Sequence, residues 1–189
     1  MNPPTAEPFA ALTEAPFLTG TIMGCLGVHF SLSLEEVQQI RAIDDESARV
    51  DYVHENIEQE YFANQPERKA ESDKAWDAMH RTLSDGELTW DGGEYPLNHV
   101  VLGGELLYTG SDFIMVLKTP ERVRDVATAL PGVTEAEFRR RYFGINPDSY
   151  GCPLSEEDFG YTWDGFQGVR DFWLRAANEG RFVVFTADQ

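Results

Sequence analysis

The chain has 189 residues, of which 42% are hydrophobic. This length is sufficient for one domain with a hydrophobic core and is short for two domains. Its 15 basic residues face 33 acidic ones, so the net charge is −18. This charge repels nucleic-acid phosphates and anionic membrane surfaces. The longest basic run, Arg139–Arg141, is itself flanked by Glu135 and Glu137. We therefore expect no nucleic-acid and no membrane partner, whereas a basic protein is a partner that the charge favours.

Cysteine and histidine usage bears on the compartment and on metal binding. Two cysteines, Cys25 and Cys152, form no disulfide framework, so we expect free thiols and a cytoplasmic location. Residues 1–24 contain acids and no Lys or Arg, unlike a secretory signal. The four histidines never fall at metal-ligand spacing. We expect no metal site and no cofactor.

The first segment differs from the rest of the chain. Residues 1–22 are rich in proline and show no amphipathic period. They predict a flexible or loosely docked extension, and residues 23–189 predict a single domain. A chain that starts at Met23 should melt within a few degrees of the full chain.

The elements begin with a strand and three helices. Alternation predicts a strand with one apolar face, formed by Leu26, Val28, Phe30 and Leu32. Ser33 and Glu36 have capping-box spacing at the start of a helix. A second helix is predicted from about Ser47, followed by a loop over 62–71. The stretch "DKAWDAMHRTL" (73–83) predicts a third helix that Ser72 can cap and Gly86 can end.

The second half of the chain alternates between strands and helices. "HVVLGGELLY" and "DFIMVLKT" are rich in β-forming residues and predict paired strands. Thr119 and Pro120 start a helix, and Thr134 with Glu137 starts another. A loop at 145–158, a long aromatic helix and the strand "RFVVFTA" follow. This order predicts the α+β class: a small mixed β-sheet packed against several α-helices in a single domain.

Several blocks together resemble a known family. "MGCLGVHFSLSLEEV", "DKAWDAMHRTLSDG", "YPLNHVVLGGELLY", "FIMVLKTPERVRDVATAL" and "FQGVRDFWLRAANEGRFVVF" occur in this order. They are similar to the YfbM-like family, bacterial proteins classed as a domain of unknown function. The resemblance covers residues 23–189 and implies a compact cytosolic α/β-type domain. It implies no activity, cofactor or catalytic residue.

The third helix carries the strongest candidate for chemistry. On one interpretation His80 is a general base oriented by Asp77, one helical turn away. No nucleophile elbow, Cys–His signature or phosphate-binding loop accompanies it, so we predict no catalytic residues. The favoured alternative is structural: Trp76, Met79, His80 and Leu83 form one apolar stripe, and the imidazole bonds to backbone. On that interpretation Asp77 and Arg81 lie on the opposite, solvated side.

Five residues remain as candidates for binding: His80, Trp76, Asp77, Tyr108 and Tyr150. The preferred hypothesis is a non-catalytic binding or interaction protein, specifically an acidic inhibitor or immunity-type protein that masks a basic effector. The alternative is a small hydrolase or transferase with a pocket around His80. A fully buried His80, with both ring nitrogens bonded to protein groups and no cleft nearby, would exclude the alternative, whereas an exposed His80 at the base of a pocket would favour it. The sequence leaves both a monomer and a homodimer open.

Overall fold

A five-stranded sheet forms the centre of the computed structural model, which describes residues 26–188. The strands are β1 (Gly27–Leu32), β2 (Lys69–Asp73), β3 (Glu105–Leu106), β4 (Phe113–Lys118) and β5 (Phe182–Asp188), in the order β2-β1-β5-β4-β3. Every pairing is antiparallel, so the α+β class is confirmed but the sheet is not mixed. The helices between β4 and β5 return the chain to the end of the sheet that it left, where Lys118 pairs with Val183.

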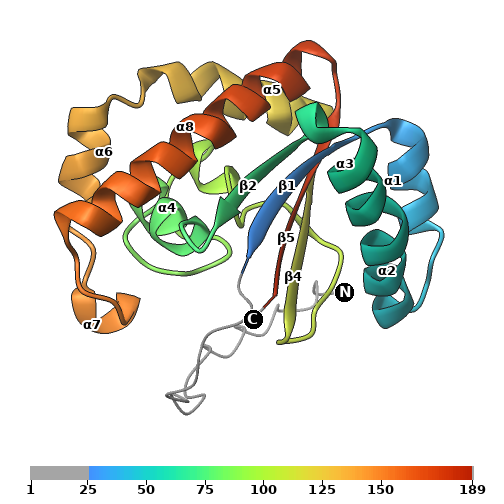
Figure 1. Cartoon of the computed structure of the whole chain (residues 1–189), viewed down its shortest axis with the longest axis horizontal. Coiled ribbons are helices and arrows are strands. Elements are labelled where there is room, and N and C mark those ends of the chain that lie inside the picture. Colours follow the sequence, from blue (N-terminus) through green and yellow to red (C-terminus); the bar gives the residue numbers. More distant parts are fainter. Residues whose placement is uncertain (1–25, 189) are drawn as a thin grey trace, which may run out of the picture.

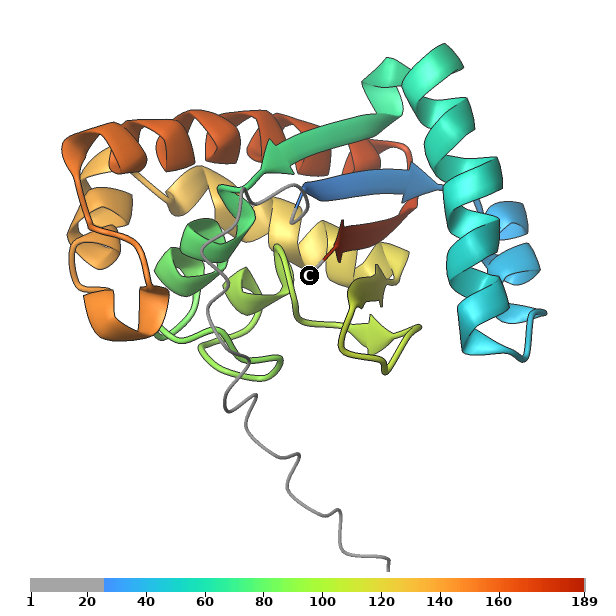
Figure 2. The ribbon, with the colours of Figure 1, turned by 60° about the horizontal axis from the view of Figure 1, so that its bottom comes forward.

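Helices cover both faces of this sheet (Figure 1). One side holds α1 (Leu34–Arg41), α2 (Glu46–Tyr52), the π-helical segment η1 (Val53–Glu58) and α3 (Gln59–Asn64). The other side holds α4 (Trp76–Leu83), α5 (Pro120–Ala129), α6 (Glu135–Tyr142), α7 (Pro147–Tyr150) and α8 (Glu156–Asn178). Single 3₁₀ turns η2 (Pro66–Arg68), η3 (Leu97–His99) and η4 (Leu130–Gly132) lie between them. Figure 2 shows the long α8 lying alongside β2.

The sheet separates two hydrophobic cores. Val28, Phe30 and Leu32 of β1 pack toward α1, η1 and α3, while His29 turns to the aromatic core beneath α8. The alternation predicted for this strand is therefore confirmed within β1. Leu26, expected on the same face, precedes the strand and is 52% exposed.

Most helix starts follow the predicted capping residues. Ser33 and Glu36 form the full capping box of α1. The second predicted helix is one continuous run through α2, η1 and α3. Thr134 accepts a hydrogen bond from the Glu137 amide, but the Glu137 carboxylate bonds to arginines instead of closing a box. The prediction for residues 1–22 lies outside the described residues.

Three segments differ from their predictions, and the first is the expected loop at 145–158, which contains α7 and the first turn of α8. The expected loop over 62–71 ends in β2, an edge strand in which only Ser72 is buried. Edge strands are often polar, so this strand lacks the apolar alternation that marks a central one. Of the expected strand "HVVLGGELLY", only Glu105–Leu106 pairs with β4. The preceding residues form turns whose amides and carbonyls bond locally or to side chains, although they are as buried as a strand would be.

Candidate functional site

Helix α4, which carries the predicted candidates, is buried on nearly all sides. Every residue of α4 except Asp77 is buried, and the Trp76 side chain is only 4% exposed. The Trp76 ring lies 5.8 Å from the Phe185 ring of β5. Ser72 does not cap this helix: its hydroxyl donates to the Gly27 carbonyl at 3.0 Å and holds β2 to β1. The helix is thus positioned by burial in the core.

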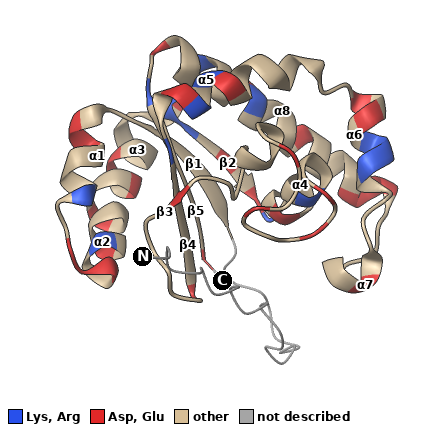
Figure 3. Cartoon of the chain, turned by 180° about the vertical axis from the view of Figure 1, so that it is seen from behind, with Lys and Arg blue, Asp and Glu red and all other residues tan. Residues whose placement is uncertain are grey.

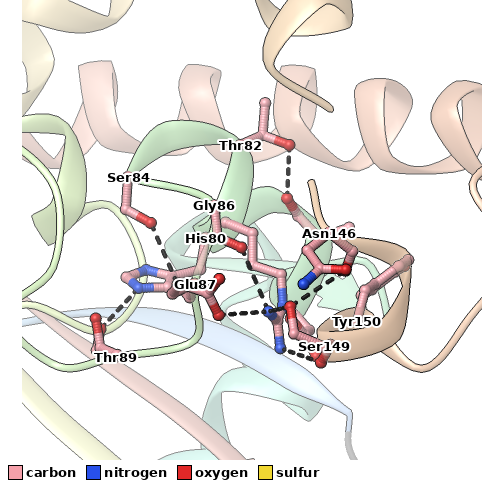
Figure 4. Close-up of polar contacts among 12 residues, drawn as sticks. His80, Thr82, Ser84, Gly86, Glu87, Thr89, Asn146, Ser149 and Tyr150 are labelled. Atoms are coloured by element: carbon pink, nitrogen blue, oxygen red, sulfur yellow. Dashed lines mark hydrogen bonds and ion pairs between the residues drawn. The ribbon is translucent and has the colours of Figure 1, made fainter. Parts of the chain in front are cut away.

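His80 lies inside the protein and bonds to backbone. It is 1% exposed, and its Nε2 donates to the Thr89 carbonyl over 2.9 Å. Figure 4 shows the ring turned toward Thr89 and away from Ser149 and Tyr150. Burial lowers the pKa of His80 to about 4. Its Nδ1 makes no hydrogen bond within residues 26–188, and Asp77 bonds to Arg81 rather than orienting this imidazole.

Arg81 is the residue whose position the sequence pattern mispredicted. It is 6% exposed instead of solvated, because the short helix α7 covers it. Its Nε donates to the Asp77 carboxylate at 2.5 Å, and its terminal amino groups donate to the Ser149 hydroxyl and carbonyl at 3.2 and 3.0 Å. A fourth acceptor is the Gly86 carbonyl. Arg81 therefore ties α4 to α7.

The two tyrosine candidates lie in different parts of the fold. Tyr150 of α7 packs against the Arg81 guanidinium and donates to the Asp158 carboxylate at 3.0 Å. Tyr108 follows β3, packs with the other core, and donates to Asp112 at 2.6 Å. Burial is the main cause that raises the pKa of Asp77, and Arg81 opposes it. The structure thus brings Asp77, Arg81 and Tyr150 together and leaves Tyr108 apart.

A hollow beside α4 was missed by the sequence reasoning. Three adjoining cavities of about 220, 300 and 320 Å³ share lining residues, and Arg141 of α6 borders all three. We call this hollow the α4–α6 groove. Four segments form its walls: the end of α4, residues 93–97, the end of α5 with η4, and α6. The lining includes Arg81, Leu83, Asp85, Leu97, Ala129 and Phe138. His80 lines none of these three cavities.

The charges of the groove centre on α6. Arg140 donates to both oxygens of Glu137, and Arg141 donates through Nε to Glu137 Oε1 at 2.8 Å. These bonds lower the pKa of Glu137 to about 2. Figure 3 shows the basic positions of α6 opposite the acidic positions of the loop after α4. The sequence signal for this site is the run Arg139–Arg141, the longest basic run of the chain.

The core contains a buried basic cluster of His29, His80 and Lys118, with the half-buried His99 at its margin. His29 Nε2 donates to the Val100 carbonyl at 2.9 Å, and Lys118 Nζ donates to the neighbouring Val101 carbonyl. These bonds hold the turns that follow η3. Burial lowers the pKa of His29 to about 3 and that of Lys118 well below its ordinary value.

The comparisons with known proteins identify the family. The family described as a domain of unknown function, DUF1877, matches residues 23–186. The chain belongs to this family. Its structure is similar to the crystal structure of YfbM from Escherichia coli, a protein of unknown function, with a TM-score of 0.62 and 20% identity. The similarity covers 86% of this chain and 99% of YfbM, so the YfbM-like fold is confirmed. A search of curated proteins finds no match.

Residues 26–188 contain neither a membrane-crossing helix nor a cluster of metal-ligating side chains. No helix there has both the length and the apolar character that crossing a bilayer requires. The same part of the chain contains no group of three or more His, Cys, Asp or Glu side chains that could hold a metal ion.

Proposed function

We propose that this DUF1877 protein is a non-catalytic binding protein and that the α4–α6 groove is its ligand site. The observation that carries the proposal is the groove itself: three adjoining cavities with an apolar floor and a polar rim, the usual make-up of a small-molecule site. Leu83, Leu97 and Phe138 supply the apolar floor.

The lining favours binding over catalysis. The residues that border the three cavities include no His, Cys or Lys. The two hydroxyls that border the polar part donate to backbone: Thr82 to the Ala78 carbonyl at 2.7 Å and Ser84 to the Glu87 carbonyl at 3.5 Å. Neither hydroxyl is hydrogen-bonded to a His, Asp or Glu side chain in the described part of the chain, as an activated nucleophile would be. The burial of His80 and its absence from the lining count against the hydrolase or transferase hypothesis, although its Nδ1 has no hydrogen-bond partner among the described residues.

A neutral fluorescent probe tests the groove. N-phenyl-1-naphthylamine, which fluoresces in apolar surroundings, should bind saturably at one site per chain. Ala129→Trp fills the groove with an indole and should abolish this binding. The control is Thr128→Trp, which adds the same indole at the exposed neighbouring position outside the lining. Absence of saturable binding, or equal binding by both variants, would refute the proposal.

A second candidate function rests on the opposite side of the molecule. Residues 34–64 hold nine Asp and Glu residues against Arg41 and Arg49, a net charge of −7. Arg41 pairs with Glu105, and Arg49 donates to the Ile43 and Leu107 carbonyls. This helical side is therefore complementary to a basic protein, as an acidic inhibitor or immunity-type protein requires.

Charge reversal tests the second candidate. A basic protein that co-purifies from host extract at low salt should dissociate at high salt. It should also be lost when Asp51 and Glu55, both exposed on this side, are changed to Lys. The control, Glu179→Lys, changes an exposed acid beyond the end of α8 and should retain the partner. Retention by the double variant would contradict this role.

A further inference from the structure

The groove has two chemically different ends that meet at one residue. The cavity of about 220 Å³ is lined mainly by apolar groups, among them Leu83, Leu97, Val133 and Phe138. The cavity of about 300 Å³ is bordered by Arg81, Arg140 and Arg141, with Asp85 on the facing wall. Arg141 borders both, so a molecule that enters the apolar end has its other end beside this guanidinium.

Arg141 has donors to spare. Its Nε bonds to Glu137, while its terminal amino groups make no hydrogen bond with the described residues. Its side chain is 38% exposed and so can be reached from solvent. Two guanidinium donors in fixed geometry are suited to a carboxylate or another oxyanion.

Glu137 offsets only part of the positive charge of its two neighbouring arginines. Glu137 Oε1 accepts hydrogen bonds from both Arg140 and Arg141, so one carboxylate serves two guanidinium groups. Arg81 is offset by Asp77. Asp85 borders the same cavity but forms no ion pair with Arg141 in the described structure. The pair Arg140 and Arg141 therefore carries one positive charge more than Glu137 offsets, while Asp85 and Glu94 bring the lining of the whole groove to neutrality.

We infer that the groove takes a small amphiphilic anion, whose carboxylate or similar headgroup binds the free amino groups of Arg141 and whose apolar part occupies the end lined by Leu83, Leu97 and Phe138. This inference rests on the proposed binding function and specifies the chemical class of its ligand. Arg141 is the residue that selects the anion, and the apolar end supplies affinity without regard to charge.

Two probes that differ by one sulfonate separate the contribution of Arg141 to affinity from that of the apolar end of the groove. Anilinonaphthalene sulfonate is N-phenyl-1-naphthylamine with an added anionic group. It should bind the unchanged protein about tenfold more tightly than the neutral probe, the factor that one charged hydrogen-bonded contact provides. Arg141→Gln should remove this preference and leave the affinity for the neutral probe within about twofold. Decanoate should displace either probe more strongly than decanol does.

Control variants sharpen the result. Arg139→Gln removes an arginine of the same basic run that bonds to Glu156 and lines none of the three cavities, and it should leave the affinity for the anionic probe within about twofold. Asp85→Asn removes a repelling charge from the facing wall and should tighten that probe. Equal affinity for the two probes, or an anion preference that survives in Arg141→Gln, would overturn the inference while leaving the groove as a site. Failure of both probes to bind would instead refute the proposed function.

Discussion

At the scale of single residues, Trp76 makes the largest contribution of α4 to the core. Its indole packs on Phe185 and on the backbone of Gly27, where an added Cβ would lie 2.6 Å from Trp76 Cδ1. Trp76→Ala should therefore lower the free energy of unfolding by about 3–5 kcal/mol, as deletion of a large buried aromatic does. Chemical denaturation measures this loss. The partly buried Trp90 serves for comparison, and Trp90→Ala should cost less than half as much.

Arg81 should matter more than a solvated helix position would. Arg81→Gln removes the contact with Asp77 and with the α7 backbone inside a buried site, so we expect a loss of about 2–3 kcal/mol in the free energy of unfolding. Arg140→Gln is the matched control: that side chain is 71% exposed, and its loss should change stability by no more than about 0.5 kcal/mol. Equal denaturation midpoints for the two variants would show that the Arg81 contacts contribute nothing.

At the scale of elements, the N-cap residues of α1 and α5 allow the contribution of a capping hydrogen bond to be measured. The Ser33 hydroxyl accepts from the Glu36 amide, whereas Thr119 caps α5 without any side-chain hydrogen bond. Ser33→Ala should cost about 1 kcal/mol of stability. Thr119→Ala should be nearly neutral by the same denaturation assay. A loss that is as large at Thr119 as at Ser33 would mean that the hydroxyl bond is not the source of the stability.

The same elements show which features the sequence could predict. Caps and amphipathic helices were predictable because they depend on residues close together in the chain, such as Ser33 with Glu36. The conformation of Val100 and Val101 was not predictable, because an apolar run can be equally buried in a strand or in turns. In the structure the carbonyls of these two residues accept hydrogen bonds from the side chains of His29 and Lys118, which belong to two other strands.

The candidate site was predictable only in part. Burial of His80 and Trp76 followed from the helical stripe. The burial of Arg81 did not, because it depends on α7, which docks from 68 residues further along the chain. The α4–α6 groove likewise needs walls from four separate segments, so no local pattern marks it. The basic run Arg139–Arg141 could be recognised in the sequence. Which of its guanidinium groups keeps free donors depends on the hydrogen bonds that Glu137 accepts in the fold.

At the scale of the whole molecule, the buried basic cluster should make the fold sensitive to acid. The pKa values of His29 and His80 are lowered to about 3 and about 4, below the ordinary value of 6.5, mainly by burial. Below that ordinary value the unfolded chain binds protons that the folded chain does not, so stability must fall as the pH falls. Each histidine should contribute about 2 kcal/mol of loss by about pH 5.

Denaturation between about pH 7.5 and about pH 5 measures this dependence. His29→Gln can keep the bond to the Val100 carbonyl but cannot take up a proton, so its stability should fall less steeply with acid. His80→Gln provides a second, independent reduction of the slope. A slope that neither variant changes would assign the acid sensitivity to other groups.

The position of β5 in the sheet bears on how the protein is made. This strand is the last one in the described chain, yet it lies between β1 and β4 and pairs with both. During synthesis on the ribosome, Gly27–Leu32 and Phe113–Lys118 cannot form their hydrogen bonds with residues 182–188 until those residues have left the exit tunnel. During those seconds of translation the apolar stretch "FIMVLK" has no central partner, and it is then that the nascent chain most needs protection by chaperones.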